Sequence, residues 1–211
     1  MGRTSSILSL GLVRLVLASS SPRRAELLRA AGFTFDTLVV DIDEGTGPYE
    51  SPENYVRRIA MDKSAAATRS SVVSGFRGTG EDPVILAADT AVVVDGEILG
   101  KPRDDQDAAA MLGRLSGRVH QVMTGVSVRT KNRELGRVER TAVEFAPLSD
   151  KEISWYVASE EGRDKAGAYA IQGLASRFVP RIEGSYSNVV GLPVACVFEL
   201  LKETGFLASP Q

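Results

Sequence analysis

The sequence predicts an α/β or α+β fold built on a mixed sheet. Short apolar runs typical of buried strands alternate with stretches of helical spacing, and this order favours parallel strand pairs. Asp95-Gly96 between two apolar runs, and the alternating segments 121–130 and 135–145, instead indicate hairpins, which need antiparallel pairs. Helices among both kinds of pairing imply a mixed sheet.

The first elements are a strand, a helix and a second strand. The apolar run at residues 13–18 predicts a buried strand. Residues 23–31 have helical spacing, with Pro22 suited to the first turn and Gly32 to the position after the last. Residues 33–40 predict the second strand, and a Gly/Pro-rich loop follows it.

The next segment contains the longest predicted helix. Ser51 can cap its start and Pro52 fits its first position, so a helix is expected over residues 51–67. Residues 70–83 hold four Gly or Pro and predict a surface loop. Strands then follow at 84–88 and 91–94, the second entering the Asp95-Gly96 turn.

The second half continues with helices and strands. Residues 104–115 predict a helix, and the two alternating segments predict neighbouring strands. The spacing of Ser149 and Glu152 is that of a capping box, which starts a helix over 149–159. The remaining elements are expected to be strands at 168–171 and 176–182 and a last helix at 193–204 closed by Gly205.

These elements predict one domain over residues 13–207, preceded by a tail at 1–12. A chain of 211 residues that is 43% hydrophobic can bury a full core. Arg14 interrupts the N-terminal apolar stretch before it resembles a signal peptide. No segment approaches 18 uninterrupted apolar residues, so no membrane span is expected.

Composition narrows the function classes. A net charge of −2 gives no general positive field for nucleic acid, so an anionic ligand would be held by local cations. Cys196 is the only cysteine, which rules out an intramolecular disulfide and favours a reducing, cytoplasmic compartment. His120 is the only histidine, which excludes zinc sites built on several His or Cys and disfavours a Ser-His-Asp hydrolase. A catalytic base is therefore expected to be a carboxylate.

The polar run after the first strand suits a phosphate. Ser19, Ser20 and Ser21 supply hydroxyls, and Arg23 and Arg24 supply planar guanidiniums that can hold phosphate oxygens in pairs. The following helix start adds unpaired N–H groups and a partial positive charge. The residues alone leave open a simpler interpretation, a capped helix with a solvated Arg pair.

Carboxylates follow two of the predicted strands. Asp89 is expected at the C-terminal end of a buried strand, where it would ligate a divalent metal or orient water, although it could instead form a turn. Asp41, Asp43 and Glu44 follow the second strand and could hold Mg²⁺. A solvated acidic turn explains that cluster equally well.

Five segments in order, spanning about residues 13–204, resemble the Maf family of nucleoside triphosphate pyrophosphatases. They are Ser19-Ser20-Ser21-Pro22-Arg23-Arg24, Ala87-Ala88-Asp89-Thr90, Gly100-Lys101-Pro102, the run 164–173 and the run 185–193. The resemblance also singles out Glu44, with a one-residue uncertainty toward Asp43, and Lys63. Within the family the motifs look like the branch that acts on dTTP and UTP rather than the one that acts on 7-methyl-GTP.

The resemblance implies an elongated α/β fold with a central cleft, similar to inosine triphosphate pyrophosphatases. It implies hydrolysis of a nucleoside triphosphate to the monophosphate and pyrophosphate with Mg²⁺ or Mn²⁺. Catalytic roles would fall to Asp89, Lys101, Lys63 and Arg24, and metal binding to Glu44 and Asp89. Substrate contacts are expected from Ser19, Ser21, Arg23, Arg24, Thr90, Lys101 and Gln172.

The expected partner is the nucleotide, with no nucleic acid and no membrane, and a homodimer fits the family. One alternative is a nucleotide-binding regulator of septum formation without turnover. A nucleic-acid-binding protein is another, which the acidic pI of about 5.6 argues against.

Overall fold

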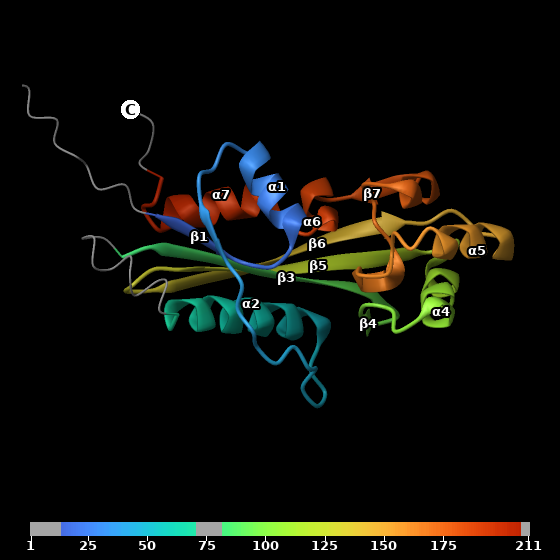
Figure 1. The fold of residues 1–211 in the computed structure, drawn as a ribbon, viewed down its shortest axis with the longest axis horizontal. Coiled ribbons are helices and arrows are strands. Elements are labelled where there is room, and N and C mark those ends of the chain that lie inside the picture. The colour runs from blue at the N-terminus through green and yellow to red at the C-terminus, as the bar shows by residue number, and fades with distance from the viewer. Residues whose placement is uncertain (1–13, 71–81, 208–211) are drawn as a thin grey trace, which may run out of the picture.

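The computed structural model describes residues 14–70 and 82–207. The predicted tail at 1–12 and most of the predicted loop at 70–83 lie outside the described residues. Figure 1 shows a long sheet with helices on both faces. None of the described helices is both long and apolar enough to cross a membrane.

Within the described residues the sheet has seven strands, and it is mixed, as predicted. Its order is β2(Asp36–Leu38), β1(Leu15–Ala18), β3(Val84–Val94), β5(Val119–Arg129), β6(Glu134–Glu144) and β7(Arg181–Glu183), with the short β4(Glu97–Leu99) also paired to β3. β1 runs parallel to β2 and β3, whereas the other pairs are antiparallel. The β3–β4 turn has φ values of 55° at Asp95 and 78° at Gly96, as the predicted Asp-Gly hairpin requires.

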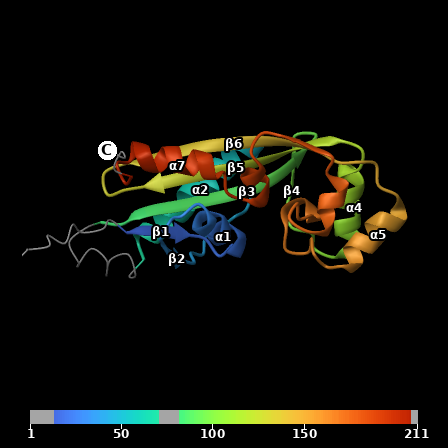
Figure 2. The same ribbon diagram turned by 90° about the horizontal axis from the view of Figure 1, so that it is seen from above.

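Helices cover both faces and one end of the sheet. They are α1(Pro22–Ala30), α2(Pro52–Thr68), α4(Asp105–Leu115), α5(Asp150–Ala158), α6(Tyr186–Val190) and α7(Val194–Glu203), with 3₁₀ turns η1(Ala166–Ala168) and η2(Leu174–Phe178). Figure 1 shows α2 on one face of the sheet and α1 and α7 on the other. Figure 2 shows α7 near one end of the sheet and α4 and α5 beyond the opposite end. The predicted caps Ser51 and Ser149 and the Ser149–Glu152 capping box are confirmed.

The core follows this layering. Alternate residues of β3 face opposite sides, as strand geometry requires. Leu86 and Ala88 pack in a cluster with α1 and α7, while Ala91 and Val93 pack with Val56 of α2. A third cluster under α4 and α5 is rich in aromatic rings and includes Phe145, Tyr156, Tyr169 and Phe178.

Two strand boundaries differ from the prediction. The strands expected at 84–88 and 91–94 are one strand, so Asp89 lies within β3 and not at a strand end. The polar pair Asp89-Thr90 does not break the strand because Lys63 bonds the carboxylate and Arg24 bonds the hydroxyl. The second strand, expected over 33–40, pairs with β1 only at 36–38.

The strands predicted at 168–171 and 176–182 were wrong, apart from the short β7. Gly167 and Ala168 have φ values of 69° and 58°, which are incompatible with a strand. The chain forms η1 and η2 there, and its apolar side chains enter the aromatic cluster. Residues 186–190, within the run 185–193 that carries the family resemblance, form the short α6, and the Ser185 side chain caps it by accepting from the Asn188 N–H.

Candidate active site

A cleft of about 450 Å³ opens beside the middle of β3. β1 pairs with one edge of β3 as far as Ala87, and β4 pairs with the same edge only from Val92 onward. Within the described residues no strand covers this edge between those points, and Asp89 and Thr90 lie in the gap. The cleft therefore forms where two strands share one edge of a third without meeting.

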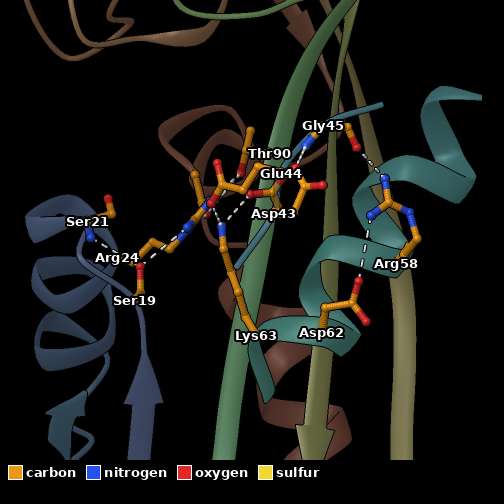
Figure 3. Close-up of polar contacts among 12 residues, drawn as sticks. Ser19, Ser21, Arg24, Asp43, Glu44, Gly45, Arg58, Asp62, Lys63 and Thr90 are labelled. Atoms are coloured by element: carbon orange, nitrogen blue, oxygen red, sulfur yellow. Dashed lines mark hydrogen bonds and ion pairs between the residues drawn. The ribbon is translucent and has the colours of Figure 1, made fainter. Parts of the chain in front are cut away.

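Lys63 holds two carboxylates together at this gap. Its Nζ lies 2.7 Å from Asp89 Oδ1 and 2.7 Å from Glu44 Oε1. Figure 3 shows the Lys63 side chain pointing toward Glu44. Lys63 is 8% exposed and Asp89 is 7% exposed, so both charges are buried. Each has the opposite charge beside it, which offsets the cost of burying it. Partial burial alone would raise the pKa of Glu44, but the hydrogen bond and charge of Lys63 outweigh it and hold that pKa below its usual value.

Gly125 makes this approach of α2 geometrically possible. It pairs with Asp89 across β3 and β5, and a Cβ at this position would lie 2.1 Å from the backbone oxygen of Val56 in α2. The missing side chain lets α2 lie directly on the sheet, so the Lys63 side chain reaches the carboxylate of Asp89.

Arg24 enters the cleft from the opposite face of the sheet. Its Nε donates to the Gly191 carbonyl at 2.8 Å, Nη2 donates to Thr90 Oγ1 at 3.0 Å, and Nη1 donates to Ser19 Oγ at 3.3 Å. Burial lowers the pKa of Arg24, while the charges of Asp89 and Glu44 act against that shift. The guanidinium thus joins β1, β3 and the loop after α6.

The loop that carries Glu44 is tied to α2. Arg58 donates to the Gly45 carbonyl at 2.8 Å and forms a two-point ion pair with Glu50, at 2.7 Å for each contact. Tyr55 donates its hydroxyl to the Glu44 carbonyl at 3.1 Å. The Arg58 ion pair lowers the pKa of Glu50 to about 2. These contacts direct the Glu44 side chain toward Lys63.

Most of the predicted site residues line one cleft. They are Ser21, Arg23, Arg24, Glu44, Lys63, Asp89, Thr90, Lys101 and Gln172. Ser19 does not line it, because it is buried behind Arg24 and its Oγ accepts from Arg24 and from the Ser21 N–H. Asp43 turns its Oδ1 to the Gly45 N–H at 2.8 Å, so Glu44 is the carboxylate that faces Lys63.

Three lining residues belong to the motifs quoted from the sequence but lie outside the set expected to contact substrate or metal. Ser20 is exposed in the cleft, and Asp164 and Lys165 line it as an ion pair. No motif marks Arg58 and Glu50, whose role depends on a contact formed only by the fold.

The cleft is locally cationic in an acidic chain. Its lining holds Arg23, Arg24, Lys63, Lys101 and Lys165 against the carboxylates Glu44, Asp89 and Asp164. Among residues 14–70 and 82–207, no cluster of three or more His, Cys, Asp or Glu side chains could hold a metal unaided. The two carboxylates that pair with Lys63, those of Glu44 and Asp89, still fit Mg²⁺. This metal takes one or two protein carboxylates and completes its coordination shell with water and phosphate.

Comparison with known proteins places the chain in a family. A family model described as "Maf-like protein" matches residues 14–204. The chain belongs to the Maf family. A relative from Anaeromyxobacter sp. (strain Fw109-5), named dTTP/UTP pyrophosphatase, is 51% identical over 91% of this chain and 90% of its own length. A protein of the same name from Escherichia coli (strain K12) is 47% identical over 90% of this chain and 92% of its own length.

A solved structure supports the expected architecture. The Staphylococcus aureus Ham1 protein matches with a TM-score of 0.50 over 90% of this chain and 99% of its own, at 14% identity. At that identity the likeness concerns the fold alone. The family model, which matches residues 14–204, confirms over nearly the whole chain the resemblance to the Maf family first seen in five short segments.

Proposed function

We propose that this Maf-family protein is a nucleoside triphosphate pyrophosphatase that hydrolyses dTTP and UTP to the monophosphate and pyrophosphate. The observation that carries the proposal is the cationic cleft in which Lys63 holds Glu44 and Asp89 together. Relatives that are 47–51% identical over about 90% of the chain are named for these two substrates.

The charges of the cleft match a triphosphate. The substrate brings roughly four negative charges, and a fixed cationic site stabilises them without reorganising when charge moves in the transition state. Arg23 and Lys101 line the cleft and are assigned to phosphate oxygens. Arg24 bonds three protein acceptors, so its assigned part is to fix Thr90 and the Gly191 loop around the phosphates while adding positive charge.

Glu44 and Asp89 are assigned to a divalent cation. A bound Mg²⁺ or Mn²⁺ would neutralise charge on the phosphates and lower the pKa of a coordinated water. Lys63 directs both carboxylates at one point, and it holds the pKa of Glu44 below its usual value. The Asp89 carboxylate is further assigned to orient the attacking water toward the α phosphorus, because it lies at the uncovered edge of β3.

Gln172 is assigned to the nucleobase. It is exposed on the cleft wall, and its amide offers a paired donor and acceptor that suits the edge of thymine or uracil. Thr90 is assigned a minor part in discrimination because its Oγ1 already contacts Arg24 and Thr124. A cytoplasmic location and a homodimer stay predictions.

Product analysis tests the function directly. The purified protein is incubated with dTTP, UTP, modified pyrimidine triphosphates, dATP and 7-methyl-GTP, with Mg²⁺ or Mn²⁺, and pyrophosphate and orthophosphate are measured separately. We expect pyrophosphate and no orthophosphate, fastest from dTTP and UTP. Orthophosphate as the first product would place cleavage at the γ phosphate and refute the proposal. Preference for 7-methyl-GTP would refute the substrate assignment, and nucleotide binding without turnover would favour a regulator.

A further inference from the structure

The segment that carries Gln172 is tied at both ends to one pair of side chains. Gln172 lies in the turn that leads into η2 and starts at Ala170. Three residues of this turn line the cleft: Ala170, Ile171 and Gln172. Tyr156 of α5 holds the start of the turn, and Glu161, just beyond α5, holds its end. Neither residue lines the cleft.

The contacts form a continuous hydrogen-bond relay. The Ala170 N–H donates to the Tyr156 hydroxyl at 3.1 Å, and that hydroxyl donates to Glu161 Oε2 at 2.8 Å. The Leu174 N–H donates to Glu161 Oε1 at 3.0 Å, and the Ala175 N–H donates to Oε2 at 3.4 Å. Because an N–H can only donate and a carboxylate can only accept, the direction of every bond in the relay is fixed.

Packing leaves the relay little freedom to rearrange. Tyr156 is 1% exposed within the aromatic cluster under α4 and α5, so its hydroxyl is held in place by its ring. Burial, together with the carboxylate of Glu161, raises the pKa of Tyr156 far above its usual value, which keeps the hydroxyl protonated. A Cβ on Gly173 would lie 1.9 Å from Glu161 Oε1, so the turn passes as close to this carboxylate as a glycine allows.

We propose that Tyr156 and Glu161 are positioning residues for nucleobase selection. They fix the backbone on both sides of Gln172, and thereby the place of its amide on the cleft wall. This inference rests on the proposed function, since it assigns to the relay a part in choosing the base of that substrate. Neither Tyr156 nor Glu161 lines the cleft, so the relay acts through the turn that carries Gln172, on the choice of base and not on the cleavage step.

The test measures base selectivity in conservative variants. Glu161→Gln places an amide donor against groups that donate, and Tyr156→Phe removes the hydroxyl from the relay. Glu160→Gln is the matched control, because Glu160 is the neighbouring glutamate and pairs with Arg163 at the surface, 3.0 Å away. For each protein, kcat and KM are measured with dTTP and with dATP, and the melting temperature is recorded.

We expect kcat/KM for dTTP to fall at least about tenfold in Glu161→Gln and Tyr156→Phe, mainly through a higher KM, since small misplacements of a contacting group are costly. The value for dATP should stay within about twofold, as should both values in Glu160→Gln. Adding Gln172→Ala to Glu161→Gln should cause no further loss, because both changes remove the same base contact.

Each contrary result has a distinct meaning. Equal losses for dTTP and dATP would show that the relay only maintains the fold, and unchanged selectivity would show that it does not position Gln172. Either result overturns the inference. Failure of the unmodified protein to release pyrophosphate from any pyrimidine triphosphate would instead refute the proposed function. Titration calorimetry would then decide the inference by comparing the affinities for dTMP and dAMP in the unmodified protein and in Glu161→Gln. Loss of a preference for dTMP in Glu161→Gln would support the inference, and an unchanged preference would overturn it.

Discussion

Replacing Gly125 with alanine should push α2 away from the sheet and separate Lys63 from Asp89. The added Cβ would lie 2.1 Å from the Val56 oxygen and 2.8 Å from the Arg57 nitrogen. These are backbone atoms of a helix, so no side chain can turn aside. Ordinary contact begins at 3.4 Å, so the helix and the strand must separate by about 1.3 Å.

Two effects of Gly125→Ala can be given a size. Overpacking of this kind costs about 1–3 kcal/mol of stability. Lys63 lies two turns beyond Val56 on the same rigid helix, so its 2.7 Å contacts with Asp89 and Glu44 would lengthen. A displacement of about 1 Å in a catalytic arrangement can cost about 10²-fold in rate, and we expect a loss of kcat/KM for dTTP of that order.

The assay pairs kcat/KM for pyrophosphate release with urea unfolding. Gly113→Ala in α4 is the matched control, because nothing lies within 4 Å of its Cβ position and alanine favours a helix. It should be more stable by about 0.5–1 kcal/mol and retain full activity. Wild-type activity and stability in Gly125→Ala would refute the reasoning, since they would mean that the site does not depend on how closely α2 approaches.

Three further predictions concern individual ionisable side chains. Asp89→Asn should lower kcat by about 10²–10³ with the fold retained, as circular dichroism would show, because it removes the charge that pairs with Lys63 and is assigned to the metal; near wild-type turnover at saturating metal would move that role to Glu44. Arg24→Lys should lower kcat/KM at least about tenfold, because the three bonds of Arg24 start from three separate guanidinium nitrogens and the single nitrogen of an ammonium cannot reproduce that spacing. Full activity in both Arg24→Lys and Arg23→Lys would mean that the run Ser19–Arg24 serves only to start α1 and does not bind phosphate. Burial lowers the pKa of His120 to about 4, so the folded protein keeps it neutral while the unfolded chain takes up a proton below about 6.5. As the pH is lowered from about 6.5 to about 4, the free energy of unfolding measured with denaturant should therefore fall more steeply in the unmodified protein than in His120→Gln. Parallel curves for the two proteins would contradict this.

The sequence contains the local signals of the fold, and these predict it well. Ser51 with Pro52, Asp95 with Gly96, and Ser149 with Glu152 each act through neighbours in the chain, and each forms the expected cap or turn. Long-range contacts override local signals elsewhere. Asp89 resembles a strand end because it is polar, yet a lysine from another element bonds it within the strand.

The same distinction holds in the site. Arg23 and Arg24 are adjacent in the sequence and equally suited to phosphate, but only the fold shows that Arg24 bonds Gly191, Thr90 and Ser19. Residues 168–171 have the apolar character of a strand, and only the positive φ of Ala168 shows that the chain turns there. The relay of Tyr156 and Glu161 has no sequence signal, because it joins residues from separate elements through backbone N–H groups.

The ion pairs of Lys63 explain why a cleft built for an anion contains two carboxylates, one of them buried. Unpaired, the charge of Asp89 would be costly at 7% exposure, and it would also repel the substrate. Lys63 offsets both effects while leaving the Glu44 side chain half exposed at the cleft. A triphosphate that arrives with a divalent cation then meets two carboxylates directed to one point. Because Lys63 lowers the pKa of Glu44, no proton has to leave that group before the cation binds.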